Sequence, residues 1–599
     1  MNFKKTAGIA MLLASLGVIH SAAQAASGTS ASSQSASLEQ RRKVLNSLLN
    51  EQWEYKLRKN PEFASMLGDK RYNDKLSDYS QAAIDAEARA EAVFLKRFLA
   101  IDSKGFNAQE LLNKDLMVRQ LSVDVEERRF KEWQMPVLQN SGLHLESAEM
   151  VPRLSFDTVK DYQDYLTRLK ALPLAFDQIT VQMHNGIKNK LMPPQFLIEK
   201  IARQCEDIAA LSLDSSPFTL PLQKFPASFS EAEKQNLSAA IRAAVVQHVA
   251  PAYQKFAVFV ARDYAPHGRQ DVGVWSLPDG AERYKFQVKT STTTDMDAEQ
   301  IHQLGLREVA RIEAQMLATA QKLGFTDLKS FNASVLVNPD LHPKSRQEIL
   351  DKYIKYTEQM EAKLPQLFGR LPKAKMVVMA VPEFSEKEAS GASYNNGTPD
   401  GSRPGQVMVN TSDFAERLTL PIESTALHEG LPGHHMQISI AQELEGLPEF
   451  RKQGGYNAYV EGWALYSERL GEELGFFQDP YSYYGHLQDE MLRAIRLVVD
   501  TGLHYKKWNR QQVVDFFHDH SGIEEVDVQS ETDRYIVWPG QALGYKIGQL
   551  KIVELREYAT QKLGKKFDLR AFHDEVLGAG ALPLDVLEQR IHAWVNTQI

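Results

Sequence analysis

The chain has 599 residues, of which 24% are charged, and its formal net charge at pH 7 is −8. This acidic balance excludes nucleic acid as an expected partner, because nucleic-acid binding needs clustered basic residues. The length exceeds that of one ordinary hydrophobic core, so we expect two helical lobes, residues 39–290 and residues 291–599, with the functional site in the second.

The first 25 residues have the pattern of a secretory signal peptide. Lys4 and Lys5 precede an apolar run over residues 7–19, and Ala-Gln-Ala ends at Ala25. The run is shorter than the roughly 20 residues that span a bilayer, and no cysteine follows it that could carry a lipid. Cleavage removes two lysines and no acid, so the net charge moves from −8 to about −10. We expect a periplasmic or secreted protein without stable membrane insertion, in which residues 26–38, rich in Ser and Ala, are a disordered lead-in.

Most of the remaining sequence predicts α-helix. Apolar residues at helical spacing, among many Ala, Leu, Glu, Gln and Lys, favour helices over residues 39–59, 81–100, 231–260, 297–323, 343–367 and 541–563. Prolines between residues 157 and 226, such as Pro193 and Pro217, predict short helices and loops that could form one wall of a channel. The single cysteine, Cys205, allows no internal disulfide.

Two strands are predicted, KMVVMAV over residues 375–381 and QVMVN over residues 406–410, with a loop rich in Gly, Ser, Asn and Pro between them. The edge of such a sheet can bind an extended peptide by strand addition. Asn410 and the loop residue Arg403 are then candidates for contact with a substrate. A hairpin that only braces the core explains the pattern equally well.

Residues 424–437, STALHEGLPGHHMQ, resemble a zinc-binding motif whose spacing is stretched. In the motif H-E-x-x-H, two histidines four residues apart bind zinc from one face of a helix, and the glutamate is the general base. His428 and Glu429 match the start of this motif. The position of the second histidine, however, is occupied by Pro432, which cannot bind a metal.

The proline itself suggests how the motif is completed. Pro432 lacks an N–H and clashes with the carbonyl of His428, so the helix must bend or bulge there. The next histidines are His434 and His435. An excursion of two residues brings His434 to the position of the second ligand, whereas His435 needs an excursion of three. We therefore favour His434 and keep His435 as the alternative.

Glu461 is the candidate for a third ligand. It follows His434 by 27 residues, in the segment YVEGWALYSE, whose apolar residues have helical spacing. Two histidines and one glutamate are a typical set for catalytic zinc and leave one position open for water. The same set also accepts cobalt or manganese. Alternatively, Glu461 only caps or solvates its helix, and Glu468 is a rival ligand or a group that orients one.

Two later blocks carry further candidates. In VVDTGLH, Asp500 and His504 share a helix face, so the pair could stabilise negative charge on a carbonyl oxygen or simply join two helices by a buried hydrogen bond. In RYIVWPGQALGYKIG, Pro539 precedes a new helix that carries Tyr545 and Lys546 on its first turns.

The blocks HEGLPGHH, YVEGWALYSE, VVDTGLH and RYIVWPGQALGYKIG are similar to the signature blocks of the bacterial family called domain of unknown function 885, and the resemblance runs from about residue 40 to about residue 595. The general pattern also resembles mainly helical zinc peptidases such as angiotensin-converting enzyme and thimet oligopeptidase, although those keep the unstretched motif. Family members often have another residue where this chain has His435, which favours His434. The resemblance implies a mainly α, zincin-like metallopeptidase fold with a deep channel and a small β-sheet beside the metal-binding helix. By analogy with thimet oligopeptidase, it implies that Tyr545 donates a hydrogen bond to the oxyanion.

The predicted function is hydrolysis of short peptides by a zinc-activated water, with Glu429 as general base. The other candidate residues are the Zn²⁺ ligands His428, His434 and Glu461, the oxyanion donors Tyr545 and His504, and the substrate-binding residues Arg403, Asn410, Arg534 and Lys546. Of these, Arg534 or Lys546 would bind a substrate carboxylate. A zinc-dependent amidase or esterase that acts on a non-peptide, and a non-catalytic protein that binds metal or peptide, are the alternatives.

Overall fold

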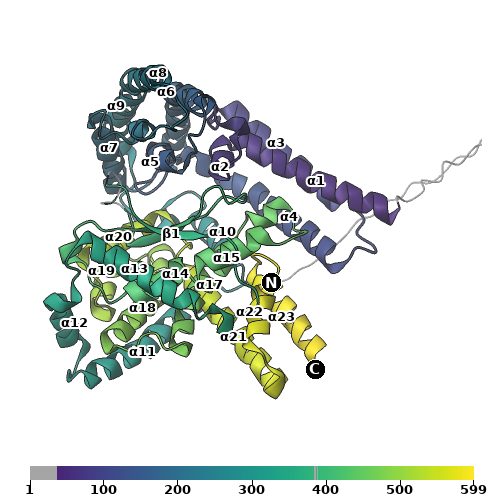
Figure 1. Cartoon of the computed structure of the whole chain (residues 1–599), viewed down its shortest axis with the longest axis vertical. Helices are drawn as coiled ribbons and strands as arrows, with labels where there is room; N and C mark the ends of the chain where they lie inside the picture. Colours follow the sequence, from purple (N-terminus) through teal and green to yellow (C-terminus); the bar gives the residue numbers. More distant parts are fainter. Residues whose placement is uncertain (1–36, 384–385, 387–388) are drawn as a thin grey trace, which may run out of the picture.

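A computed structural model describes residues 37–383, 386 and 389–599, and the chain is mainly helical with one small sheet (Figure 1). The predicted signal peptide and nearly all of the predicted lead-in lie outside the described residues. None of the helices in the described part combines the length and the apolar character that a membrane span requires. The prediction of a mainly α protein is confirmed.

The first nine helices form one group (Figure 1). They are α1 (Leu38–Lys59), α2 (Pro61–Met66), α3 (Gln81–Leu99), α4 (Ala108–Glu127), α5 (Leu143–Glu149), α6 (Val159–Asn189), α7 (Gln195–Ala210), α8 (Glu231–Ala244) and α9 (Ala250–Phe259). Helices α5 to α9 enclose a core of their own, in which Tyr162, Phe176 and Tyr253 are buried.

The later helices form a second, larger group. They are α10 (Gly280–Thr292), α11 (Ala298–Lys322), α12 (Leu328–Leu336), α13 (Arg346–Glu361), α14 (Ile422–Glu429), α15 (His434–Glu443), α16 (Glu449–Lys452), α17 (Asn457–Glu473), α18 (Pro480–His504), α19 (Arg510–His520), α20 (Glu525–Val537), α21 (Leu543–Leu563), α22 (Leu569–Leu577) and α23 (Leu584–Gln598). Helix α10, which the predicted division at residue 290 assigns to the first lobe, packs against α17 and α21. The division into lobes at that residue stays a prediction.

The predicted helices are confirmed, although some of them are interrupted at positions that the sequence does not predict. The stretch over residues 231–260 is α8, a π-helical turn at Val245–Val249 and then α9. Side-chain caps explain several starts: Ser230 and Glu233 form a capping box at α8, and Asp297 and Gln300 form one at α11.

The prediction of only short helices and loops between residues 157 and 226 is wrong for α6. This helix runs over 31 residues and has Pro173 in its interior. A capping box of Thr158 and Asp161 fixes its start, and apolar side chains such as Tyr162 and Leu169 bury one face along its length. Burial of that face outweighs the loss of one backbone hydrogen bond at the proline.

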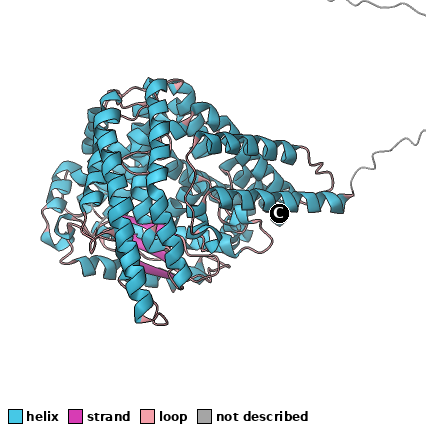
Figure 2. Cartoon of the chain, turned by 90° about the horizontal axis from the view of Figure 1, so that it is seen from above, coloured by secondary structure: helices cyan, strands magenta, loops and turns pink. Residues whose placement is uncertain are grey.

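The sheet has three strands, β1 (Met376–Ala380), β2 (Ala392–Asn395) and β3 (Gly405–Val409), shown in magenta in Figure 2. The strand order is β1-β3-β2, with β1 parallel to β3 and β2 antiparallel to it. Both predicted strands are confirmed, and β2 lies in what the sequence suggests is a loop. Residues of β3 pack with α13 and α14 in a small core, so the sheet lies beside the helix that carries His428.

Helices α17 and α21 pack with their backbones in close contact. A Cβ atom on Gly462 would lie 2.4 Å from the Cα atom of Gly548, a separation that atoms do not tolerate. The two glycines therefore allow an approach that any side chain would prevent. As a result Glu461, which precedes Gly462, and Tyr545 on α21 face one region.

A cavity of about 510 Å³ lies in the first helix group. Its lining includes Phe63, Tyr79, Trp133 and Glu149 but none of the candidate metal ligands. The deep channel that the resemblance implies beside the metal-binding helix is not this cavity and stays a prediction.

Candidate metal centre

The stretched motif folds as two helices joined by a short turn. Helix α14 ends at Glu429 and α15 begins at His434, and the N–H of Gly433 donates to the carbonyl of Leu427 at 3.0 Å. A Cβ atom on Gly433 would lie 1.9 Å from the carbonyl oxygen of His428, so only glycine fits this turn. The expected bend at Pro432 is thus a complete interruption of the helix. The indole of Trp463 on α17 donates to the carbonyl of Pro432 at 2.9 Å and fixes the turn.

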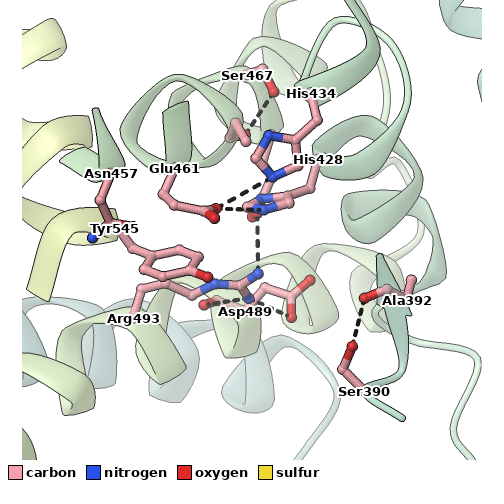
Figure 3. A network of polar contacts seen from close by, with 12 residues as sticks. Ser390, Ala392, His428, His434, Asn457, Glu461, Ser467, Asp489, Arg493 and Tyr545 are labelled. Carbon is pink, nitrogen blue, oxygen red and sulfur yellow. Dashed lines mark hydrogen bonds and ion pairs between the residues drawn. The ribbon is translucent and has the colours of Figure 1, made fainter. Parts of the chain in front are cut away.

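Three predicted ligands meet beside this turn (Figure 3). The Oε2 atom of Glu461 lies 3.6 Å from Nε2 of His428 and 3.3 Å from Nε2 of His434. One potential ligand atom from each of the three residues lies within 4.8 Å of the others. Two imidazole nitrogens and one carboxylate oxygen in this arrangement are a donor set that fits Zn²⁺.

Two polar atoms of this cluster lack a hydrogen-bond partner among the described residues. They are Oε2 of Glu461 and Nδ1 of His434, and both are shielded from solvent. A buried carboxylate oxygen without a hydrogen bond is costly unless a cation lies beside it. The unsatisfied Glu461 oxygen faces both Nε2 atoms, which is where a shared metal ion would be bound.

Electrostatics favour positive charge at the centre. Burial alone would raise the pKa of Glu461, but the adjacent His434 and His428 lower this pKa well below its ordinary value. Burial alone would lower the pKa of His428, but Glu461 and Glu468 raise it to about 10. The carboxylates thus keep their charge in a buried place, and they stabilise a cation there.

Glu468 orients a ligand. Its Oε1 atom lies 2.7 Å from Nδ1 of His428, and its Oε2 atom accepts a hydrogen bond from the Ser424 hydroxyl at 2.9 Å. One ring proton of His428 is thus held on Nδ1, so when a metal ion displaces the other proton, Nε2, the nitrogen that faces Glu461, is the one that binds it. Glu468 is predicted as either a rival ligand or a group that orients a ligand, and the geometry matches the second.

His435 points away from the cluster. Its Nε2 lies 3.1 Å from the carbonyl oxygen of Ala374, and its Nδ1 lies 2.9 Å from the hydroxyl of Tyr394 on β2. Burial lowers its pKa to about 4, which favours the neutral ring. With both nitrogens hydrogen-bonded, His435 ties α15 to the sheet and has no lone pair available for a metal.

Two of the three predicted catalytic groups lie next to the cluster. Glu429 is buried directly after His428, and its carboxylate makes no hydrogen bond or ion pair within the described ranges. The ring of Tyr545 is nearly parallel to that of His428, at 12°, with the ring centroids 6.5 Å apart. Its hydroxyl oxygen accepts a hydrogen bond from Nη2 of Arg534 at 3.1 Å. Because Arg534 is the donor in this hydrogen bond, the hydroxyl hydrogen of Tyr545 remains available for another acceptor.

His504 and Asp500 do not form the pair that the sequence suggests. Nδ1 of His504 accepts from the N–H of Val274 at 3.0 Å, and Nε2 donates to the carbonyl of Tyr535 at 2.9 Å. Asp500 instead accepts from the Tyr284 hydroxyl at 2.7 Å and from the N–H of Gly540. Both nitrogens of His504 are occupied by backbone groups, so it has no proton left for an oxyanion, and the prediction of that role is corrected.

Three of the four predicted substrate contacts are held by the protein itself. Lys546 is fully buried, with Nζ at 2.6 Å from a Glu490 carboxylate oxygen and 3.1 Å from one of Glu308. Arg403 donates to the backbone carbonyls of Arg153, Met66 and Asn396. Asn410 donates to those of Glu386 and Ala389 at 2.7 and 2.9 Å. The contacts of Arg403 and Asn410 match the alternative of a bracing hairpin. The fourth residue, Arg534, lies beside the cluster and donates to Glu531, Gln541 and Tyr545.

Sequence reasoning missed two arginines. Arg493 and Arg496 lie on α18 with their side chains largely buried, and Figure 3 shows Arg493 between Tyr545 and Asp489. The signal was present in MLRAIRLVV, where two arginines three residues apart interrupt an apolar stretch. Arginine is rarely buried without a charged or polar partner, so such a pair marks a polar site inside the fold.

Comparisons with known proteins support the family resemblance. Residues 61–591 match the family described as "Bacterial protein of unknown function (DUF885)", and no curated protein matches the sequence. The chain is similar to the "putative lipoprotein" of Colwellia psychrerythraea, with 30% identity, a TM-score of 0.89 and coverage of 93% of this chain and 99% of that one. A second such protein, of unknown function, from Shewanella oneidensis has 19% identity, a TM-score of 0.67 and the same coverage of 93% and 99%. Metallocarboxypeptidase 1 of Trypanosoma cruzi covers 93% of this chain and 96% of its own at 12% identity, but its TM-score of 0.33 is too low to support an argument.

Proposed function

Because the chain belongs to the DUF885 family, for which no function is established, we propose from its own site that it is a zinc metallopeptidase that hydrolyses short peptides. The observation that carries the proposal is the convergence of His428, His434 and Glu461, with a buried Glu461 oxygen that lacks a hydrogen-bond partner. In the described part of the chain, no other group of three His, Cys, Asp or Glu side chains brings its ligand atoms within 4.8 Å of one another.

The donor set fits a catalytic zinc site. His428, His434 and Glu461 would hold the ion, and Glu468 would keep His428 in the tautomer that binds it. When bound, zinc supplies a Lewis acid and a water of lowered pKa. Three protein ligands leave room for a water and a substrate carbonyl.

The remaining chemistry is assigned to two side chains. Glu429, whose carboxylate has no competing hydrogen bond in the described residues, accepts the proton of the attacking water and passes it to the leaving nitrogen. Tyr545 donates a hydrogen bond from its phenolic hydroxyl to the developing oxyanion. Each role uses a hydrogen-bonding capacity that the fold leaves unused.

The sheet offers a place for an extended substrate. Strand β2 is an edge strand that packs against α14, and its Tyr394 is hydrogen-bonded to His435 on α15. An edge strand has unpaired backbone groups on its outer side, and a peptide can pair with them by strand addition. This would align the peptide backbone beside the metal-binding helices.

We place the protein outside the cytoplasm. The predicted signal peptide supports this location, as does the similarity to two proteins named as lipoproteins. No cysteine directly follows the apolar N-terminal run, so lipid attachment is not carried over from those relatives.

The decisive experiment combines metal content with turnover. We expect about one zinc per chain by elemental mass spectrometry and cleavage in a library of short peptides. Glu429→Gln should keep the zinc and lower kcat by roughly 10²–10⁴-fold, the usual contribution of a general base. Cleavage of ester or amide substrates with no cleavage of peptides, or an unchanged rate in the variant, would contradict the proposal.

A further inference from the structure

Two arginines flank Tyr545 and share a single carboxylate. The guanidinium carbon of Arg496 lies 4.4 Å from the centre of the Tyr545 ring, and Arg534 donates to its hydroxyl. Glu531 binds both arginines, with its Oε2 at 2.8 Å from Arg496 and its Oε1 at 3.2 Å from Arg534. No other carboxylate of the described residues forms an ion pair with either of them. The pair therefore has one positive charge in excess.

The same arginines keep N–H groups that have no acceptor. Nη1 of Arg496 and Nε of Arg534 are shielded from solvent and lack a hydrogen-bond partner among the described residues. Arg496 is only 4% exposed. A buried donor of a charged group without a partner is costly, and a bound group that supplies an acceptor relieves this cost.

The position of the pair suggests which ligand does so. The Tyr545 ring lies near both the pair and the metal centre, with its centroid 4.4 Å from the guanidinium carbon of Arg496 and 6.5 Å from the centroid of His428. Each residue of an extended peptide spans roughly 3.5 Å. An anion bound by the arginines would therefore be one or two residues away from a peptide bond at the metal centre. The side chain of Arg534 is 21% exposed, so a ligand can reach this member of the pair.

We infer that Arg496 and Arg534 bind the C-terminal carboxylate of a peptide, so that the enzyme removes one or two residues from the C-terminus. This inference rests on the proposed peptidase function. A carboxylate fits because it carries the single negative charge that the pair lacks and accepts two hydrogen bonds in the plane of a guanidinium group. Lys546, the other predicted carboxylate binder, is already neutralised by Glu490 and Glu308.

The test compares free and amidated C-termini on the zinc-loaded enzyme. A library of N-acetyl tetrapeptides is prepared once with a free carboxylate and once as the carboxamide. We expect kcat/KM to be at least about 100-fold higher for the acids, a ratio typical of a lost charged contact. In Arg534→Gln the ratio of kcat/KM for acids to that for amides should fall by at least about 30-fold, because loss of the hydrogen bond to Tyr545 lowers both rates and cancels in the ratio.

Arg556→Gln is a matched control. Arg556 lies on α21, donates to the Tyr466 hydroxyl at 3.1 Å and pairs with Glu473, so it repeats the contacts of Arg534 with a tyrosine and a glutamate. The control should keep the preference for acids. If Arg534→Gln does not fold by circular dichroism, Arg534→Lys keeps the charge without the planar fork and should still lower the preference for acids. The ratio of kcat/KM for acids to that for amides, measured on the parent enzyme, tests the inference without either variant.

A binding measurement separates this inference from the proposed function. The zinc-loaded Glu429→Gln protein is dialysed against both libraries, and bound peptides are identified by mass spectrometry. Selective retention of acids without hydrolysis by the parent would support the carboxylate site and refute the peptidase. Hydrolysis of acids and amides at equal rates would support the peptidase and overturn the carboxylate site. Equal retention of both libraries, or retention of neither, would also overturn it.

Discussion

The region around His428 and the region around Asp500 contain the same types of buried group but opposite electrostatics. At Asp500 burial raises the carboxyl pKa to about 7, and at His504 it lowers the imidazole pKa to about 3, so both groups favour their neutral forms. At the metal centre Glu461 and His428 favour their charged forms. The side chains of Asp500 and His504 also have hydrogen-bond partners for their polar atoms, whereas Oε2 of Glu461 has none among the described residues. Histidine and carboxylate in buried helices therefore indicate a binding site only where the fold leaves their polar atoms unused.

The largest expected effect is the loss of bound zinc when one of the two adjacent histidines, His434, is replaced. His434→Ala should lower bound zinc from about one per chain to less than about a tenth, because a neutral methyl group replaces a ligand. His435→Ala should retain zinc and lose about 1–3 kcal/mol of unfolding free energy, because Ala374 and Tyr394 lose a buried partner. Elemental mass spectrometry and urea unfolding measure the two effects. Loss of zinc in His435→Ala alone would reverse the assignment.

An intermediate effect is expected from the group that orients His428. Glu468→Gln removes the charge that fixes the His428 proton, and such changes lower metal affinity by about 10–100-fold. Competition with a chromogenic chelator measures the zinc affinity. Asp500→Asn makes the equivalent change in the comparison region and should alter that affinity by less than about twofold. Equal losses of zinc affinity in Glu468→Gln and Asp500→Asn would contradict the assignment of the metal centre to the His428 region alone.

The smallest expected effect concerns pH and stability at Asp500. Its pKa rises from the ordinary 3.8 to about 7 in the folded protein, because burial disfavours the charged form. Between about pH 4 and pH 7 the unfolded chain has released this proton and the folded chain has not, so folding stability contributed by Asp500 falls as the pH rises. Asp500→Asn should remove the loss, which is on the order of 1–3 kcal/mol.

The measurement for Asp500 is the difference in unfolding free energy between variant and parent. Urea titrations at pH 5 and pH 8, with the same zinc loading, should show that this difference shifts in favour of the variant at the higher pH. A difference that is independent of pH would mean that Asp500 is ionised throughout, as Glu461 is expected to be.

Much of the fold follows from local sequence signals, and the exceptions have identifiable causes. Periodicity and caps predict helices such as α1 and α11, and apolar runs predict β1 and β3. Strand β2 was missed because four residues in a Gly-rich loop become a strand only by pairing with β3. Helix α6 was underestimated because its buried face compensates for Pro173.

At the candidate site, spacing and residue type were enough to select His428, His434 and Glu461, which the fold brings together. They were not enough to show which charged groups the fold neutralises. Lys546 meets Glu308, which lies 238 positions earlier in the chain, and His504 meets the N–H of Val274. Such partners depend on tertiary packing, so motif reading alone could not exclude these two residues as functional groups.

The contact of Gly462 with Gly548 determines how the site is aligned, although neither residue has a reactive side chain. Side chains between helices can change rotamer and absorb small shifts, but two touching backbones cannot. The distance between the helix backbones that carry Glu461 and Tyr545 is therefore fixed. Even one added methyl group at either glycine would misalign both without touching either. Gly462 and Gly548 thus set the spacing of the candidate site, and a search for reactive side chains would overlook them.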